Sequence, residues 1–285
     1  MTRNPHTFIG CDAEYAESGI VIFGAPFDST TSYRPGARFG CSAIRNESFG
    51  IETFSPYQDR DLAYMRIFDG GDLDLPFGSP EAALDAIAAQ ADEILGDGKI
   101  PVMLGGEHLV TLGAVRSAVR RHPDLRIVHF DAHADLRDDY LGVKLSHACV
   151  IRRCHELVGD GRIFQFGIRS GDGAEFEWGS EHVKTCRFGF SRLADAVHEI
   201  GDAPVYVTVD LDVLDPSCFP GTGTPEAGGV SFVSLLWALK TALRLNVVAM
   251  DFTELSPVYD ASGASTALAC KILREALLLL GGRNT

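Results

Sequence analysis

Three side chains that commonly bind metal ions stand at alternate positions in one short segment. Asp131, His133 and Asp135 form the sequence Asp-Ala-His-Ala-Asp directly after the apolar run 126–130. Side chains at alternate positions of an extended segment point to the same side, so these three are predicted to converge where a strand ends. Carboxylates and imidazoles are ligands for divalent metal ions. The spacing therefore predicts a metal site.

Two other apolar runs lead to residues of the same kind. Residues 205–209 precede Asp210 and Asp212, and residues 100–104 lead through two glycines to Glu107 and His108. A single aspartate after a strand is usually a turn former or a helix cap. Several aspartates at one end of a sheet repel each other strongly unless cations neutralise them. The candidate metal ligands are therefore His108, Asp131, His133, Asp135, Asp210 and Asp212.

These ligands are more than one catalytic ion needs if it keeps a position open, so two ions that share carboxylates are expected. Oxygen-rich coordination with two imidazoles favours Mn²⁺ over zinc, with Fe, Co or Ni as alternatives. Two divalent ions would balance the aspartate charges and would lower the pKa of water from about 15.7 toward about 7. The expected reaction class is metal-assisted hydrolysis.

The composition fits a globular α/β protein. The chain has 285 residues, of which 46% are hydrophobic and 22% charged, and we expect a single domain over residues 1–285. It has no apolar run of 18 residues, the length that indicates a transmembrane helix. Residues 1–10 lack the basic and apolar regions of a signal peptide. No membrane partner and a cytoplasmic location are therefore expected.

The net charge and the cysteine content speak against a nucleic-acid-binding protein and against a disulfide-bonded one. The net charge of −14 speaks against a nucleic-acid partner, because binding phosphates requires clusters of Lys and Arg. The seven cysteines lack a Cys-x-x-Cys pair, so they are expected to be reduced and mostly buried thiols.

Short β-rich runs alternate with helical patterns, as in a parallel sheet covered on both faces. Strands are expected at 20–23, 65–68, 101–104, 126–130, 163–167, 183–187, 205–209 and 247–252. The clearest helix, 80–95, has Ser79 as its N-cap and Gly96 just past its end. Further helices are expected after Glu107, His147, Ser191, Ser231 and Ser262, the last covering 264–280. The expected fold class is α/β, arranged as a three-layer sandwich or a barrel.

Three long loops follow strands, at residues 24–40, 136–146 and 216–229. Open α/β sheets bind ligands at the carboxyl ends of their strands. These loops are therefore predicted to form the walls of a pocket over the metal ions.

Five motifs together are typical of one family. They are Gly-Gly-Glu-His at 105–108, Asp-Ala-His-Ala-Asp at 131–135, Ser-His at 146–147, Asp-Leu-Asp-Val-Leu-Asp-Pro at 210–216 and Thr-Glu-Leu-Ser-Pro at 253–257. In order and spacing they resemble the motifs of the ureohydrolases, which include arginase and agmatinase. The resemblance extends from residue 24 to the final helix, and it is strongest to agmatinase.

The resemblance implies a three-layer α/β/α fold around a parallel, eight-stranded sheet and a pair of Mn²⁺ ions per subunit. It implies hydrolysis of a guanidinium group to urea and an amine. By the family pattern, one ion is held by His108, Asp131, Asp135 and Asp210, and the other by Asp131, His133, Asp210 and Asp212. It also implies a homo-oligomer, a trimer or a hexamer.

Three residues are expected to act on the substrate. A guanidinium is a planar, delocalised cation, and Glu254 is the candidate carboxylate that orients it. His147 matches the family's histidine and is the candidate proton donor or shuttle, titrating near neutrality. Asp135 is expected to hydrogen-bond the nucleophile besides ligating. Glu107 departs from the aspartate of many relatives and is expected to alter only the surroundings of the ligands.

The substrate is a small cationic guanidino compound, and agmatine is the favoured one. The loop 136–145 lacks the stretch by which arginases read the substrate's α-carboxylate and α-amino groups. Asp138, Asp139 or Tyr140 could accommodate the amine of agmatine, whereas Arg137 and Lys144 could pair with the carboxylate of 4-guanidinobutyrate. Thr224 is a candidate for the pocket wall or for a turn.

Two other classes stay open. A non-catalytic paralogue that binds a metabolite is disfavoured, because a retired site has no need for so many acidic ligands. Hydrolysis of an amide or phosphoester is disfavoured by Glu254 as a cation clamp and by the lack of a phosphate-binding glycine-rich loop with lysine.

Overall fold

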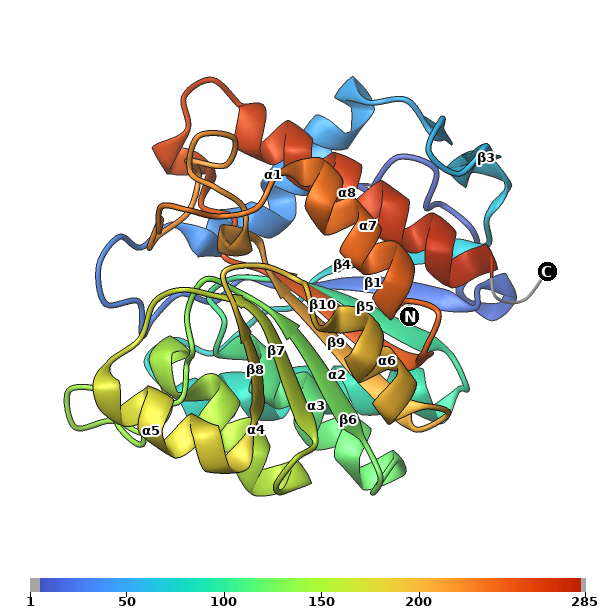
Figure 1. The fold of residues 1–285 in the computed structure, drawn as a ribbon. Coiled ribbons are helices and arrows are strands. Elements are labelled where there is room, and N and C mark those ends of the chain that lie inside the picture. Colours follow the sequence, from blue (N-terminus) through green and yellow to red (C-terminus); the bar gives the residue numbers. More distant parts are fainter. Residues whose placement is uncertain (1–5, 283–285) are drawn as a thin grey trace.

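The computed structural model describes residues 6–282 and is built on one eight-stranded, all-parallel sheet (Figure 1). The strand order is β4-β1-β5-β10-β9-β6-β7-β8. The strands are β1 (Ile20–Ala25), β4 (Ile67–Asp72), β5 (Ile100–Gly105), β6 (Arg126–Phe130), β7 (Ile163–Ile168), β8 (Lys184–Arg187), β9 (Pro204–Asp210) and β10 (Asn246–Thr253). Every strand predicted from the apolar runs is present.

The predicted position of β4 was too early in the chain. It was expected at 65–68, but it begins at Ile67 and continues through polar residues to Asp72. Arg45 makes this possible, because its guanidinium pairs with Asp69 at 2.9 Å and with Asp72. The pattern of apolar residues alone could not indicate a strand end held by ion pairs.

Helices cover both faces of the sheet, which confirms the three-layer sandwich (Figure 1). One layer contains α1 (Gly40–Glu47), α6 (Leu193–Ile200), α7 (Phe232–Ala242) and α8 (Ala264–Gly281). The other contains α2 (Pro80–Gly96), α3 (Val110–Arg121), α4 (Val150–Val158) and α5 (Gly173–His182). A separate hydrophobic core fills the space between the sheet and each layer.

The predicted helix starts are largely confirmed. Ser79 caps α2 by accepting a hydrogen bond from the backbone N–H of Ala82, although the helix includes Gly96 and ends one residue later than expected. Helices α1 and α5 and the small hairpin of β2 (Phe54–Ser55) and β3 (Arg60–Asp61) were not predicted. Both helices are short and lack a long apolar stripe.

The sheet order brings four strands from distant parts of the chain together. The strands β5, β10, β9 and β6 are consecutive in its centre. Their carboxyl ends lead to the four segments that the sequence marked as chemically active. Parallel strands present these ends at one edge, where open α/β sheets bind ligands.

Two further expectations concern the chain as a whole. All seven cysteines are free, and six are buried, as predicted for reduced thiols. Within residues 6–282, no helix has the length and apolarity needed to cross a bilayer. The single domain over residues 1–285 stays a prediction.

Candidate metal centre

A first group of predicted ligands surrounds the imidazole of His108. This ring lies in the turn between β5 and α3, and its Nδ1 is 3.0 Å from Asp131 Oδ2, 3.0 Å from Asp135 Oδ2 and 3.4 Å from Asp210 Oδ2. Ligand atoms about 2.1 Å from one ion stand roughly 3.0–3.4 Å apart at angles between a right angle and a tetrahedral one. The distances from His108 Nδ1 to these three oxygens are therefore those expected between ligands of one divalent ion.

A second group surrounds the imidazole of His133. Its Nδ1 lies 3.0 Å from Asp212 Oδ2 and 3.5 Å from Asp131 Oδ1. Asp131 thus faces the first group with one carboxylate oxygen and the second group with the other. A carboxylate in this position can bridge two ions.

The ligands converge, but strand alternation does not bring them together as predicted. Strand β6 ends at Phe130, before the first ligand. Asp131 then accepts a hydrogen bond from the backbone N–H of His133 at 2.5 Å, and Asp135 has a left-handed backbone with φ 54°. Tight turns at the strand ends, not an extended segment, aim these side chains.

The segment after β9 forms a similar turn, in which a carboxylate accepts a hydrogen bond from the backbone two residues later. Asp210 accepts a hydrogen bond from the backbone N–H of Asp212 at 2.8 Å and caps the short 3-10 helix Leu211–Val213. The Asp212 carboxylate in turn accepts a hydrogen bond from the backbone N–H of Ala132, at 3.2 Å. The two acidic turns are therefore locked to each other across the sheet edge.

The centre concentrates negative charge away from water. Burial, followed by repulsion from Asp212 and Asp131, raises the pKa of Asp210 well above its ordinary value. Burial and the neighbouring Asp131 raise the pKa of Asp135 to about 7. Bound cations relieve such repulsion, and oxygen donors with two imidazoles suit hard or borderline divalent ions. The chemistry of the donor set therefore fits a pair of metal ions.

Glu254 lies beside the first group and is held there by the backbone. It follows β10, has a left-handed φ of 64°, and its Oε1 accepts a hydrogen bond from the backbone N–H of His108 at 2.8 Å. Its own N–H donates to the carbonyl of Gly106. A Cβ at Gly106 would lie 1.8 Å from the carbonyl oxygen of Phe27, so this close approach requires glycine. Burial, then Glu107 and Asp212, raises the pKa of Glu254 well above its usual value.

His147 is fixed by residues of the 24–40 loop. Its Nδ1 donates to the carbonyl of Thr30 at 2.9 Å, which leaves Nε2 facing the hydroxyl of Ser32 at 3.1 Å. Burial lowers the pKa of His147 to about 4. The expectation that this ring titrates near neutrality is therefore wrong for the free protein. The ring is neutral at pH 7, and Nε2 is the atom able to take up a proton.

Glu107 anchors that loop. Its carboxylate accepts hydrogen bonds from Thr30 Oγ1 at 2.5 Å and Thr31 Oγ1 at 2.8 Å, and Thr30 Oγ1 also accepts one from the backbone N–H of His147 at 3.2 Å. Glu107 is thus connected to His147 through one threonine. Glu107 therefore helps to position the backbone at His147 and is not confined to the surroundings of the predicted ligands.

Two buried contacts behind the ligands were missed in the sequence. His129 lies in β6, and its Nε2 is 2.8 Å from Asp131 Oδ2. Gln165 donates to the Ala134 carbonyl at 2.8 Å with the same amide nitrogen that lies 3.1 Å from His129 Nδ1. This nitrogen must donate, so His129 Nδ1 accepts and Nε2–H donates to the carboxylate. His129 stands two positions before Asp131 in the sequence, and this spacing was the signal that could have revealed the contact.

A cavity of about 240 Å³ opens above the centre. It is lined by ligands of both groups, by Glu254, His147 and Thr224, and by an outer rim of Arg137, Tyr140, Asp172 and Glu175. Its volume is below the roughly 300–1,000 Å³ typical of sites for drug-sized ligands. It therefore suits a small molecule, and Thr224 belongs to its wall.

The charges at the rim differ from those expected. Arg137 pairs with Asp172 at 2.7 Å and approaches Glu175 at 3.4 Å. These two acids form the capping box of α5, and the Asp-x-x-Glu spacing was the signal that could have found them.

The remaining charged residues of the 136–146 loop do not line this cavity. Asp138 pairs with Arg153 at 2.8 Å and lies 3.9 Å from Lys144, and Asp139 accepts a hydrogen bond from the backbone N–H of Gly142. Asp138, Asp139 and Lys144 therefore contact other parts of the protein in this structure, and a role for them in substrate binding stays a prediction.

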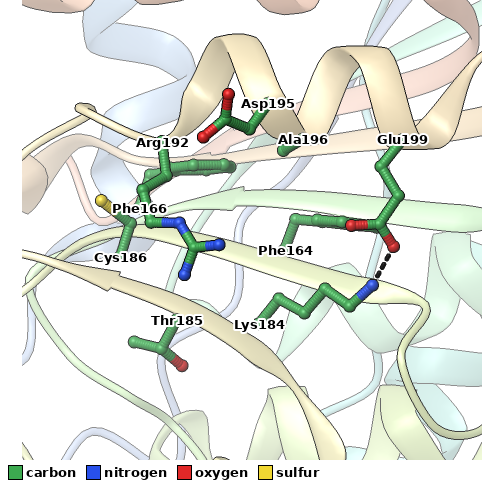
Figure 2. A pocket seen from close by; sticks show the side chains of 9 residues that line it. All are labelled: Phe164, Phe166, Lys184, Thr185, Cys186, Arg192, Asp195, Ala196 and Glu199. Atoms are coloured by element: carbon green, nitrogen blue, oxygen red, sulfur yellow. Dashed lines mark hydrogen bonds and ion pairs between the residues drawn. The ribbon is translucent and has the colours of Figure 1, made fainter.

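A second cavity lies between β8 and α6, away from the centre (Figure 2). It is lined by Phe164 and Phe166 and crossed by the ion pair of Lys184 and Glu199. It holds about 40 Å³, which is the space of a water molecule or two. It is too small to bind a substrate.

Residues 18–279 match the model of the arginase family. The chain belongs to the arginase family. This confirms the resemblance to the ureohydrolases, whose binuclear metal chemistry the clustered ligands can serve.

Individual relatives within the arginase family support this assignment. An agmatinase of Bacillus subtilis is 46% identical over 95% of this chain and 95% of its own. A crystal structure from Clostridium difficile superposes with a TM-score of 0.93 at 46% identity, covering 95% of this chain and 100% of that one. A guanidinobutyrase of Pseudomonas aeruginosa is 33% identical over 99% of this chain and 92% of its own. Arginase-family relatives of this chain thus differ in substrate.

Proposed function

We propose that this protein is a metal-dependent agmatinase that hydrolyses agmatine to putrescine and urea. One observation carries the proposal: two histidine–carboxylate groups share Asp131, and both open into the cavity that also contains Glu254 and His147. The similarity to proteins named agmatinase supports the choice of substrate.

The proposed metal sites follow the two groups around the histidines. One ion is held by His108, Asp131, Asp135 and Asp210, and the other by Asp131, His133, Asp210 and Asp212. Mn²⁺ is the proposed metal, because most of these donors are carboxylate oxygens. When bound, such a pair lowers the pKa of water and supplies a nucleophile at neutral pH.

Glu254 and His147 supply the remaining chemistry from the protein. The Glu254 carboxylate, held by the His108 backbone, orients the planar guanidinium toward the centre. His147 Nε2 faces the cavity, accepts a proton and passes it to the leaving amine. Asp135 accepts a hydrogen bond from the nucleophile and fixes its orientation.

The outer rim supports an amine at the far end of the substrate. Arg137 is already paired with Asp172 and Glu175, so this trio carries a net charge of −1. A protonated amine is attracted to this rim, whereas a carboxylate must compete with two acids for one guanidinium. The proposal therefore favours agmatine over 4-guanidinobutyrate, which stays the second candidate because of the guanidinobutyrase relative.

The location of the protein, its pathway and its oligomeric state are proposed from the family resemblance and the sequence. We propose a cytoplasmic enzyme that takes part in polyamine synthesis and works as a homo-oligomer, a trimer or a hexamer. The intact acidic ligands, Glu254 and His147 speak against the non-catalytic alternative, because an unused site has no reason to keep this electrostatic cost.

A substrate panel tests the proposal. The protein, loaded with Mn²⁺, is assayed for urea from agmatine, arginine, 4-guanidinobutyrate, 3-guanidinopropionate and guanidine. We expect the highest kcat/KM with agmatine. Higher activity with 4-guanidinobutyrate would replace the substrate but keep the enzyme class, and inactivity toward all five would refute the function.

A further inference from the structure

Three metal-type side chains meet at the opposite ends of α4 and α5 from the cavity. His155 lies in the last turn of α4, Asp160 in the turn that follows, and His182 is the last residue of α5. His155 Nε2 and His182 Nδ1 lie 2.7 Å and 2.6 Å from the same oxygen, Asp160 Oδ1. The three donor atoms all lie within 4.8 Å of one another.

The backbone holds Asp160 between the two histidines. Gly159 donates its N–H to the carbonyl of His155 at 2.7 Å, and Gly161 donates its N–H to the carbonyl of His182 at 2.9 Å. Both glycines have positive φ, 85° and 68°, a conformation that few other residues adopt. The turn is therefore tied to each helix end by a separate hydrogen bond.

Trp178 fixes the orientation of both imidazoles. Its ring stacks on His182 at 4.2 Å and meets His155 edge-on at 4.7 Å. The guanidinium of Arg152 lies 3.7 Å from the centre of the same indole ring. The imidazoles are thus oriented by packing, which reduces the entropy lost when they bind a ligand.

We propose that His155, Asp160 and His182 form a peripheral Zn²⁺ site. Two imidazole nitrogens and one carboxylate oxygen are a common protein ligand set for zinc, with a water molecule in the fourth position. Bonds of about 2.0–2.1 Å in a tetrahedron place the donors roughly 3.3 Å apart. The Asp160 side chain is 68% exposed and can rotate to widen the present contacts while its backbone stays tied.

The site joins the far ends of two helices whose first residues lie next to the lining of the cavity. His147 precedes α4 by three residues, and Asp172 caps the start of α5. A zinc ion shared by the far ends of both helices restricts their relative motion and stabilises the folded chain, since the unfolded chain does not present the three ligands together. The proposed zinc site is independent of the identity of the substrate.

Zinc binding to matched variants tests this site. Each protein is kept in excess Mn²⁺, so that exchange at the central site contributes equally, and zinc bound per chain is counted by equilibrium dialysis and elemental analysis. Asp160→Asn and His182→Gln remove one ligand each, and His198→Gln changes an exposed histidine of α6 outside the cluster. We expect wild type and H198Q to bind one zinc ion more than D160N and H182Q, with at least tenfold higher affinity.

Thermal unfolding supplies an independent readout. Zinc is expected to raise the Tm of wild type and H198Q by more than that of D160N and H182Q, while urea formation without zinc stays unchanged in D160N. Equal zinc content and equal Tm shifts in all four proteins would overturn the proposal. Because neither readout uses the guanidino substrate, failure here is distinct from failure of the proposed agmatinase activity.

Discussion

The carboxylate of Glu254 and the backbone N–H of His108 are joined by a hydrogen bond of 2.8 Å. This contact connects the end of β10 to the end of β5, two neighbouring strands that are distant in sequence. It fixes the proposed guanidinium clamp relative to the first metal group. The position of the clamp is therefore set by backbone geometry and not by a flexible side-chain partner.

Replacing Glu254 with glutamine separates the effect of its charge from that of its hydrogen bond to His108. The amide oxygen of Gln still accepts the His108 hydrogen bond, but the charge that attracts the guanidinium is lost. We expect unchanged metal content and a fall in kcat/KM on the order of 10²-fold or more. Steady-state urea assays measure kcat/KM, and elemental analysis measures the metal content. Wild-type kinetics in this variant would remove Glu254 from the mechanism.

His133→Ala tests the assignment of ligands to two ions. His133 contacts Asp212 and Asp131 in the second group, whereas His108 contacts three aspartates in the first. We expect H133A to retain about one ion per chain after Mn²⁺ loading and dialysis. Glu254→Gln is the matched control and should retain two. Two tightly bound ions in H133A would contradict the assignment.

Thr30→Val tests the connection between Glu107 and His147. Valine has nearly the same shape as threonine, but it removes the hydroxyl that donates to Glu107 and accepts from the His147 backbone. Leaving buried polar groups without partners costs about 1–3 kcal/mol. We expect a lower Tm and a lower kcat with normal metal content. Thr241→Val, at a half-buried threonine of α7, serves as the control, and equal effects of both changes would argue against the connection.

His129→Phe tests the contact behind Asp131. The change keeps an aromatic ring in the core but removes the donor to Asp131 Oδ2. Partners of this kind typically change metal affinity by about 10–100-fold. Metal titration should therefore show weaker binding in H129F. Thr185→Val leaves the His129 bonds in place, since the Thr185 hydroxyl donates to the amide oxygen of Gln165 and not to the nitrogen that faces His129, and this variant should bind metal normally.

The stability of the metal-free protein should depend on pH through Asp135. Its pKa is raised from 3.8 to about 7, so the folded state binds more protons than the unfolded state between those values. This contribution to stability therefore decreases as pH rises through that window. The difference in Tm between wild type and Asp135→Asn, measured without metal from pH 5 to 8, isolates it. We expect Mn²⁺ to raise the Tm of wild type most at the upper end of this pH range. A Tm difference between the two proteins that does not change with pH would contradict the raised pKa of Asp135.

Much of the fold was predictable because buried parallel strands are continuous apolar runs. The runs ending before His108, Asp131 and Asp210 identified the strands and their order in the chain. The order of strands in the sheet was not predictable, because it depends on packing between segments such as β5 and β10, which pair although more than a hundred residues separate them. Local periodicity carries no information about that pairing.

The site residues were predictable by type and spacing, but their geometry was not. The turns at Asp131 and Asp210 depend on carboxylate-to-backbone hydrogen bonds that replace the expected strand alternation. The pKa of His147 depends on its burial beneath the 24–40 loop, which no local pattern records. The rim acids Asp172 and Glu175 reach the cavity only because α5 begins there.

The place of β10 in the sheet has a consequence for synthesis. Among the strands of the eight-stranded sheet it comes last in the described chain, yet it lies between β5 and β9. A nascent chain on the ribosome that has not reached Asn246 presents two unpaired edges at the middle of the sheet, an arrangement prone to wrong pairing. The contact between the Glu254 carboxylate and the His108 backbone therefore forms only once β10 has entered the sheet, after every predicted metal ligand has been synthesised.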